Sequence, residues 1–333
     1  MTNEQLNHYQ PFAVCDSHLH LVYQDTLEKT IKIYTNIMDY YHYERIVLQC
    51  MLNEVSGDAG NNAKALYVKS VMNATDPARK VYANGTLFHY YDGRDTADGY
   101  LRQVELMDAL GFDGIKMLDG KPDSRKKLGR RLDDPIFDKF YEYAQEHDMP
   151  FTYHVGDPAA NWDRTKVSKA ALERGWFWDE TYTSLEQLRE EMEGILTKFP
   201  RLRITLAHFY FMGDDLEGTI EFFEKWKNVS FDICPGGEMF VGFSSRVNEW
   251  RKFFQTRKRQ PPAEPSPETL PRKQSPQPEH RESSESATGG ISTAAVRRRR
   301  TGPRQGSSRW HSAYTCRPTR IGGQEWHCRW RWL

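Results

Sequence analysis

Seven short apolar runs alternate with stretches of helical periodicity, and this alternation constrains the fold more than any other feature of the sequence. The apolar runs cover residues 12–15, 45–51, 81–88, 114–118, 151–155, 203–208 and 229–233. The helical stretches cover residues 26–41, 61–73, 96–110, 134–147, 184–199, 214–227 and 246–254. A strand followed each time by a helix predicts an α/β fold with a parallel sheet covered by helices. An open doubly wound sheet and an eight-fold β/α barrel of the TIM-barrel type both satisfy the pattern, and seven units of such a barrel are recognisable.

The composition of the chain changes near residue 256, where an eighth unit of a barrel would begin. The net charge is zero, but residues 1–256 carry 30 basic and 40 acidic side chains, whereas residues 257–333 sum to +10. The later segment holds 9 of the 17 prolines and has no Phe, Met, Asn or Asp. Such a composition buries too little apolar surface to offset the entropy of ordering the chain. We therefore predict an incomplete barrel over 1–256 and a disordered basic tail, rich in Pro, Ser and Arg, over 257–333.

A shift of reading frame near residue 256 would account for both the change in composition and the missing eighth unit. A genuine disordered tail would account only for the composition.

The remaining bulk features indicate a cytoplasmic protein. No run approaches the ~18 apolar residues of a membrane span, and residues 1–10 are polar, without the pattern of a signal peptide. The five cysteines are scattered and form no CxxC pair, which indicates free thiols in a reducing compartment.

Histidines lie at the ends of three predicted strands. The segment Asp-Ser-His-Leu-His at 16–20 follows the first strand. Because side chains alternate along an extended chain, His18 and His20 point to the same side. Both can therefore bind one metal ion. His154 ends the fifth run and His208 ends the sixth, where we expect it to share a face with Ile204 and Leu206. In a parallel barrel these ends form one rim, here called the mouth, where barrel enzymes carry their chemistry.

Two charged residues belong to the same rim. Lys116 ends the fourth run and is expected to bind an anionic substrate group, to be carbamylated and bridge two metal ions, or simply to be a solvated lysine. The basic residues 125–127 that follow it are expected in a solvated loop. Asp232 ends the seventh run and is expected to hydrogen-bond a metal-binding histidine or to form an ordinary turn. The long interval between the fifth and sixth runs carries Trp162 and Trp178 and is either a lid over the mouth or an aromatic surface subdomain.

With these motifs, the chain resembles the amidohydrolase superfamily, in the branch related to aminocarboxymuconate-semialdehyde and resorcylate decarboxylases. The resemblance covers about residues 12–255. It implies a distorted eight-fold barrel with a divalent metal ion, usually zinc, bound by His18, His20 and His154. It also implies that His208 is a catalytic histidine, which orients the attacking water or the substrate.

The chain departs from this pattern at its eighth unit. The family completes its site with an aspartate in a Gly-Ser/Thr-Asp segment after the eighth strand, where it contacts the metal and acts as a base. No such segment follows Phe254. We expect the loss of a general base to reduce turnover by ~10²–10⁴-fold.

Two enzymatic functions share the predicted residues. The first is a metal-dependent hydrolase that uses a metal-activated water on a small-molecule amide, ester or lactone. The alternative is a metal-dependent, non-oxidative decarboxylase (a lyase) of an aromatic or unsaturated carboxylic acid. In both cases the partner is a small-molecule substrate, and homo-oligomers are common among such enzymes.

Two non-enzymatic functions remain as weaker hypotheses. The barrel would be an inactive interaction partner if the missing aspartate abolishes turnover. The tail would bind nucleic acid if its four arginines at 297–300 contact phosphates and its tryptophans stack on bases. The acidic composition of residues 1–256 does not favour nucleic acid as a partner.

Overall fold

The structure is a computed structural model, which describes residues 14–22, 26–51, 61–234 and 237–256. All of these residues belong to the first of two compact units, Met1–Pro267. The predicted tail over 257–333 lies outside the described residues. The predicted domain boundary at residue 256, the missing eighth unit and the shift of reading frame therefore stay predictions.

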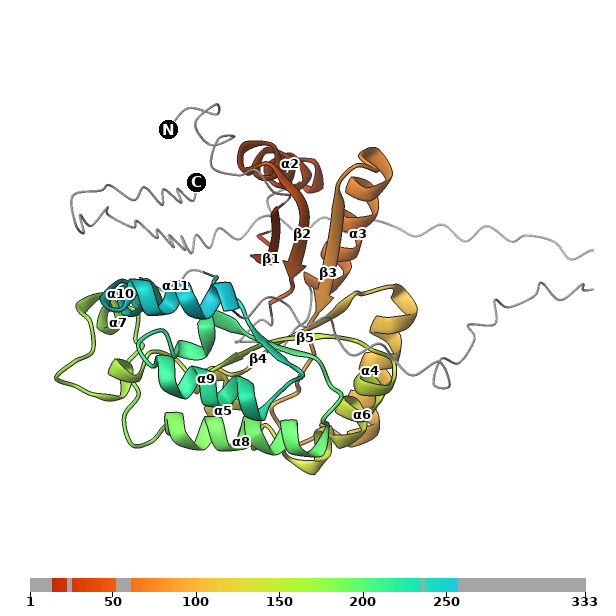
Figure 1. Cartoon of the computed structure of the whole chain (residues 1–333). Coiled ribbons are helices and arrows are strands. Elements are labelled where there is room, and N and C mark those ends of the chain that lie inside the picture. The colour runs from red at the N-terminus through yellow and green to blue at the C-terminus, as the bar shows by residue number, and fades with distance from the viewer. Residues whose placement is uncertain (1–13, 23–25, 52–60, 235–236, 257–333) are drawn as a thin grey trace, which may run out of the picture. The chain divides into compact units, whose positions relative to one another are not determined.

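Seven parallel strands form one sheet in the order in which they occur in the chain, from β1 to β7 (Figure 1). The strands are β1 (Val14–His20), β2 (Tyr43–Gln49), β3 (Lys80–Gly85), β4 (Gly114–Gly120), β5 (Phe151–Val155), β6 (Ile204–Leu206) and β7 (Val229–Phe231). This sequential order is that of a β/α barrel, and it confirms the prediction of a TIM-barrel-type fold with seven recognisable units.

Helices follow the strands and lie outside the sheet (Figure 1). They are α2 (Leu27–Tyr41), α3 (Asn61–Thr75), α4 (Ala97–Leu110), α5 (Pro122–Leu128), α6 (Asp138–Glu146), α7 (Lys169–Glu173), α8 (Leu185–Lys198), α9 (Leu216–Lys225), α10 (Gly237–Ser245) and α11 (Val247–Thr256). Three short 3-10 helices are η1 (Pro135–Phe137), η2 (Ala159–Trp162) and η3 (Ala207–Phe211).

Local sequence explains where several helices begin and end. The Thr26 side chain accepts a hydrogen bond from the Lys29 amide at the start of α2. Ser184 and Gln187 form a reciprocal capping box at the start of α8. Gly111 ends α4 with a φ of 84°, a left-handed conformation that costs glycine little.

Side chains from strands that are not neighbours meet on the concave side of the sheet, which shows that the sheet is strongly curved. Neighbouring strands lie about 4.8 Å apart, so β2 and β5 would be about 14 Å apart in a flat sheet. Instead, Gln49 Nε2 in β2 lies 3.2 Å from Thr152 Oγ1 in β5. At the two ends of the sheet, His18 Nδ1 in β1 lies 2.7 Å from Asp232 Oδ2, one residue after β7. The seven strands therefore curl into an open barrel.

The outer face of this barrel is apolar, and the inner face is largely polar. The ring of Phe151, for example, packs against Phe140 and Tyr141 of α6 at centroid distances of 5.3 and 5.8 Å. Strand alternation turns a buried polar or charged set inward: Gln49, Asn84, Lys116, Thr152 and His154. Barrel interiors are usually filled by Val, Ile and Leu. The polar interior below the mouth is therefore an unusual property of this chain.

Two predicted elements differ from the structure. The first strand extends through His20, so the two histidines lie within it rather than after it. The basic residues 125–127, which we expected in a solvated loop, lie in α5, because Arg125 forms two 2.9 Å hydrogen bonds to the buried Glu191 of α8.

Candidate metal centre

The six residues predicted for the site come together at the mouth of the barrel. They are His18 and His20 in β1, Lys116 in β4, His154 in β5, His208 in η3 and Asp232 directly after β7. Contacts of 3.2 Å or less connect all six into one cluster.

The carboxylate of Asp232 hydrogen-bonds the Nδ1 nitrogen of His18. Its Oδ2 lies 2.7 Å from His18 Nδ1, and both side chains are buried. Its Oδ1 accepts hydrogen bonds from the backbone amides of His208 at 2.9 Å and Cys234 at 3.1 Å. An acceptor at Nδ1 assigns the proton of the imidazole to that nitrogen. The lone pair of His18 therefore lies on Nε2, which faces the mouth.

His18 Nε2 has two close neighbours. His20 Nε2 and Lys116 Nζ each lie 3.0 Å away. Lys116 is only 1% exposed, so the prediction of a solvated lysine is wrong. Burial lowers the pKa of Lys116 to about 8, and no ion pair within the described part of the chain involves this side chain. Lys116 is thus a buried amine that faces imidazole nitrogen.

His154 and His208 form a second pair of imidazoles. His208 Nε2 lies 3.2 Å from His154 Nδ1, while His154 Nε2 donates to the carbonyl oxygen of Gly156 at 3.0 Å. That donation leaves the lone pair of His154 on Nδ1, where it accepts from His208. The His208 ring also has a hydrogen bond to the backbone of Cys234, which raises its pKa against the stronger lowering by burial.

His208 reaches the mouth by an unusual turn. Strand β6 ends at Leu206, and residues His208, Phe209, Tyr210 and Phe211 all have φ between 52° and 57°. The expectation that His208 shares a strand face with Ile204 and Leu206 is therefore wrong.

Left-handed backbone costs about 1–2 kcal/mol for each residue other than glycine. Buried aromatic packing offsets this cost: the ring of Phe209 lies 5.4 Å from Trp250 and 5.1 Å from Phe231. Surrounding structure of this kind is what retains strained backbone at functional sites.

The imidazoles of the cluster are neutral. Burial is the largest cause that lowers the pKa of His154 and His208 to about 3, and it also lowers the pKa of His18 and His20 well below the usual value. The positive charge of Lys116 acts in the same direction. Neutral imidazoles present lone pairs, which is the form that binds metal ions.

A tryptophan from the long β5–β6 interval contacts Asp157, which lies beside His154 of the cluster. Trp178 is buried, and its Nε1 donates to Asp157 Oδ2 at 3.0 Å, while Asp157 Oδ1 lies 3.4 Å from His154 Nε2. Burial raises the pKa of Asp157 to about 6. This part of the interval therefore packs against the segment that follows β5. The lid and the aromatic surface subdomain both stay predictions.

The donor groups present suit a divalent metal ion. Two nitrogen ligands at ~2.0–2.1 Å from a tetrahedral zinc ion lie about 3.3 Å apart, close to the 3.0 Å between His18 and His20 Nε2. Among the residues that the structure describes, no three or more His, Cys, Asp or Glu side chains surround a single point. The four imidazoles instead meet as two pairs, whose His18 and His208 ring centroids lie 5.4 Å apart. The four imidazoles are donor groups of the type that binds a metal ion. Of the two pairs, His18 and His20 already have the spacing of two ligands of one ion.

Sequence reasoning missed the polar residues beneath this cluster, which are Gln49, Asn84 and Thr152. Each lies in an otherwise apolar strand run, and each is buried. A lone amide or hydroxyl inside such a run was the available signal.

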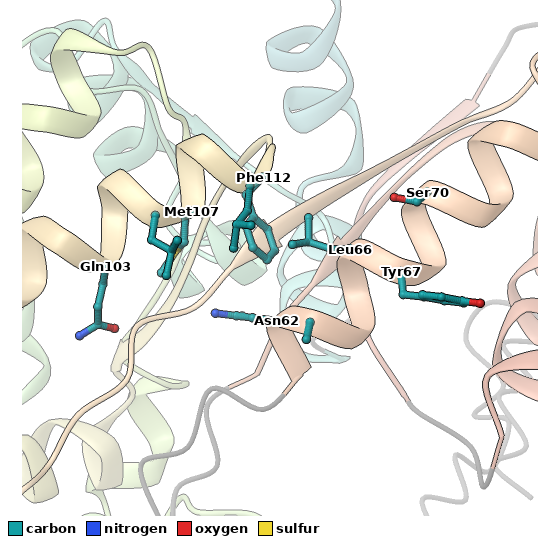
Figure 2. A pocket seen from close by; sticks show the side chains of 10 residues that line it. Asn62, Leu66, Tyr67, Ser70, Gln103, Met107 and Phe112 are labelled. Carbon is teal, nitrogen blue, oxygen red and sulfur yellow. The ribbon is translucent and has the colours of Figure 1, made fainter. Parts of the chain in front are cut away.

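One groove in the described part of the chain lies away from this cluster. Its volume is about 600 Å³, and it lies between α3 and α4, with Leu66, Tyr67 and Met107 among its lining residues (Figure 2). None of the six predicted residues lines it. Within the described residues, none of the helices is long and apolar enough to cross a membrane.

Several solved structures resemble the chain at low sequence identity. An uncharacterised TIM-barrel protein, Bb4693 from Bordetella bronchiseptica, is 11% identical, with 71% of this chain and 80% of that chain covered and a TM-score of 0.47. The 2,6-dihydroxybenzoate decarboxylase from Rhizobium is 16% identical, with 66% and 79% covered and a TM-score of 0.42. A dihydroxybenzoic acid decarboxylase from Polaromonas sp. JS666, with bound manganese and 2-nitroresorcinol, is 16% identical, with 66% and 77% covered and a TM-score of 0.40. These likenesses are too distant to bear on activity, and no curated protein matches the chain.

The family of the chain follows from its sequence. A family model described as amidohydrolase matches residues 15–265, which include all six residues of the cluster. Members of this family are metal-dependent, in agreement with the neutral imidazoles at the mouth. This chain belongs to the amidohydrolase family.

Proposed function

We propose that this chain is a metal-dependent hydrolase of a small-molecule amide, ester or lactone. The observation that carries the proposal is the 3.0 Å distance between the Nε2 atoms of His18 and His20. The other ring nitrogen of His18, Nδ1, hydrogen-bonds Asp232. His18, His20 and His154 would hold the ion. Neutral nitrogen donors of this kind suit zinc.

The other residues of the cluster have distinct roles in this proposal. When bound, a divalent ion polarises a carbonyl group and makes a water molecule more acidic. His208 accepts a proton during attack and returns it to the leaving group. Asp232 keeps the ring of His18 in one orientation and one tautomer. The Lys116 amine, in its protonated form, holds an anionic oxygen of the substrate.

One observation favours a second candidate, the non-oxidative decarboxylation of an aromatic or unsaturated carboxylic acid. Lys116 is buried without a carboxylate partner in the described part of the chain, and a buried ammonium is costly until an anion pairs with it. A substrate carboxylate would supply that anion. The aromatic ring of Phe211, 5.5 Å from the His208 ring, would pack against a planar substrate.

One experiment on the full chain tests both candidates. Zinc binding is measured by calorimetry, and the zinc-loaded protein is then assayed on chromogenic esters, lactones and amides for acid release and on hydroxybenzoates for CO₂ release. Acid release supports the hydrolase, and CO₂ release without acid release supports the decarboxylase. A chain that binds no zinc, with neither activity in the presence of zinc or manganese, refutes both.

A further inference from the structure

Three buried polar side chains form a closed network inside the barrel, directly below the histidine cluster. Gln49 Nε2 donates to Thr152 Oγ1 at 3.2 Å, and Asn84 Nδ2 donates to Thr152 Oγ1 at 3.3 Å and to Gln49 Oε1 at 3.2 Å. We call these three residues the polar ring. They come from β2, β3 and β5, and each is buried.

The backbone leaves room for this network. A Cβ atom at Gly114 would lie 2.8 Å from Asn84 Oδ1 and 2.5 Å from the carbonyl oxygen of Pro150. Any larger residue at position 114 would therefore force the Pro150 backbone and the Asn84 side chain to shift. Polar groups in a barrel interior are costly unless they are fully hydrogen-bonded, so an apolar layer would be the simpler way to fill this space. The ring therefore needs an explanation beyond packing.

Among the described residues, the side chains of the polar ring make one hydrogen bond outside the ring, to strand β1. Gln49 Nε2 also donates to the carbonyl oxygen of Ser17 at 2.7 Å. This is the shortest hydrogen bond that Gln49 makes. It uses the second proton of the amide nitrogen, because the first is donated to Thr152.

Strand β1 is irregular where this bond is made. Its pairing with β2 shifts register between Asp16 and Leu19, so the intervening residues are outside the regular ladder. Side chains bond the peptide group between Ser17 and His18 on both sides: Gln49 binds its carbonyl oxygen, and Asp16 Oδ1 accepts from its amide at 3.0 Å. The plane of this peptide sets the direction in which the Cβ of His18 leaves the backbone.

We propose that Gln49 is a positioning residue for the metal centre, with Asn84 and Thr152 holding its amide in place. It fixes the peptide between Ser17 and His18 and thereby the approach of His18 Nε2 to His20 Nε2. This inference rests on the proposed function for its metal ion. The positioning of β1 itself does not depend on a metal.

The test uses Gln49→Met in the full chain, because methionine has nearly the same length but cannot donate to Ser17. Zinc affinity is measured by competition with a chromogenic chelator. Amide hydrogen exchange of residues 16–20 is measured in protein freed of metal. We expect zinc affinity to fall about 10-fold, as for other partners that orient metal ligands, and exchange of residues 16–20 to become faster.

A matched control comes from the same inner face. Thr205→Val removes the 2.9 Å hydrogen bond between Thr205 and Ser230, which is next to the ring in register but does not contact β1. A merely structural role for Gln49, which is buried while the control pair is exposed, would speed exchange throughout the sheet and not selectively at residues 16–20. Equal zinc affinity and equal exchange of residues 16–20 in Gln49→Met and the control overturn the proposal.

Two further outcomes can be told apart: Gln49→Met does not fold, or the chain binds no zinc. If Gln49→Met does not fold, Thr152→Val decides, because it removes the acceptor that holds Gln49 without touching Ser17; the proposal then requires faster exchange of residues 16–20 and weaker zinc binding than in Thr205→Val. If no variant and not even the unchanged chain binds zinc, the proposed function fails. The exchange measurement still decides the positioning role, because it is made without metal.

Discussion

Two sets of histidines, the four at the mouth and His89 after β3, have opposite electrostatic surroundings. At the mouth, four imidazoles meet one another and the amine of Lys116, and burial keeps them neutral. His89 follows β3 and lies between Tyr100 and Asp119, with Nδ1 2.8 Å from the tyrosine hydroxyl and Nε2 2.8 Å from Asp119 Oδ1. Burial is the largest single influence and would lower the pKa of His89, but the charge and hydrogen bond of Asp119 together with the charge of Asp95 outweigh it, and the pKa is raised.

The difference shows what each set is suited to do. A charged imidazole beside a carboxylate stabilises the fold as an ion pair and has no lone pair to offer. Neutral imidazoles that face one another and a lysine gain little stability from their contacts, but they present lone pairs to a cation. We therefore expect changes at the mouth to act on metal binding and changes at His89 to act on stability.

The largest expected effect is the loss of metal binding when a mouth histidine is removed. Structural zinc sites bind with roughly 10–16 kcal/mol from four ligands, so one ligand is worth about 3 kcal/mol, or over 100-fold in affinity. His20→Ala should therefore lower zinc affinity at least ~100-fold, whereas His89→Gln should change it less than about 2-fold while lowering stability. Calorimetry and thermal unfolding measure the two quantities. Equal zinc affinities in the two variants would remove the distinction between the sets.

A smaller effect is expected when the carboxylate behind His18 is neutralised. Asp232→Asn keeps the size of the side chain but weakens its hold on Nδ1 of His18, and partners of this kind change metal affinity by about 10–100-fold. Asp157→Asn is the matched comparison, because its 3.4 Å contact to His154 is longer, and it should cost less. A larger loss of zinc affinity in Asp157→Asn than in Asp232→Asn contradicts the roles assigned here.

The two sets also differ in how much of their geometry could be predicted from the sequence. Strand alternation was enough to place His18 and His20 on one side of β1, and the end of β5 placed His154, because these are local properties of extended chain. The route of His208 was not predictable in this way. Its left-handed turn needs the packing of Phe209 against Trp250, a residue 41 positions later in the chain. The ion pair of His89 likewise depends on a residue of the next strand.

The curvature of the sheet explains why the polar ring was not predictable from the sequence. Gln49 and Thr152 are 103 residues apart, and only the closing of the sheet brings them within hydrogen-bond distance. The basic run in α5 was taken for a solvated loop because its partner Glu191 is 66 residues away. Local pattern thus predicted the order of strands and helices, while contacts across the interior and between helices required the fold itself.

A change at Lys116 separates the alternatives that the sequence left open. A protonated amine 3.0 Å from His18 Nε2 repels a cation bound by that nitrogen, so Lys116→Met should raise zinc affinity by about 3-fold or more and weaken binding of benzoate-like inhibitors. Lys121→Met is the control, because Lys121 lies at the same rim but is paired with Asp123 at 2.5 Å. If Lys116→Met instead loses metal while the control keeps it, a carbamylated lysine that bridges metal ions becomes the better interpretation.

The smallest expected effect is the pH dependence of stability at His89. Because the pKa of His89 is raised in the folded state, its pairing with Asp119 stabilises the fold fully below the unfolded value of about 6.5, and this stability is lost as the pH rises through the folded-state pKa. The difference in unfolding free energy between the unchanged chain and Asp119→Asn should therefore be larger at pH 6 than at pH 9, as measured by urea unfolding. Asp98→Asn, which removes an exposed pair with Lys139, should show no such trend. A difference that grows from pH 6 to pH 9 would mean that His89 is neutral, like the histidines of the mouth, and the two sets would then share one electrostatic environment.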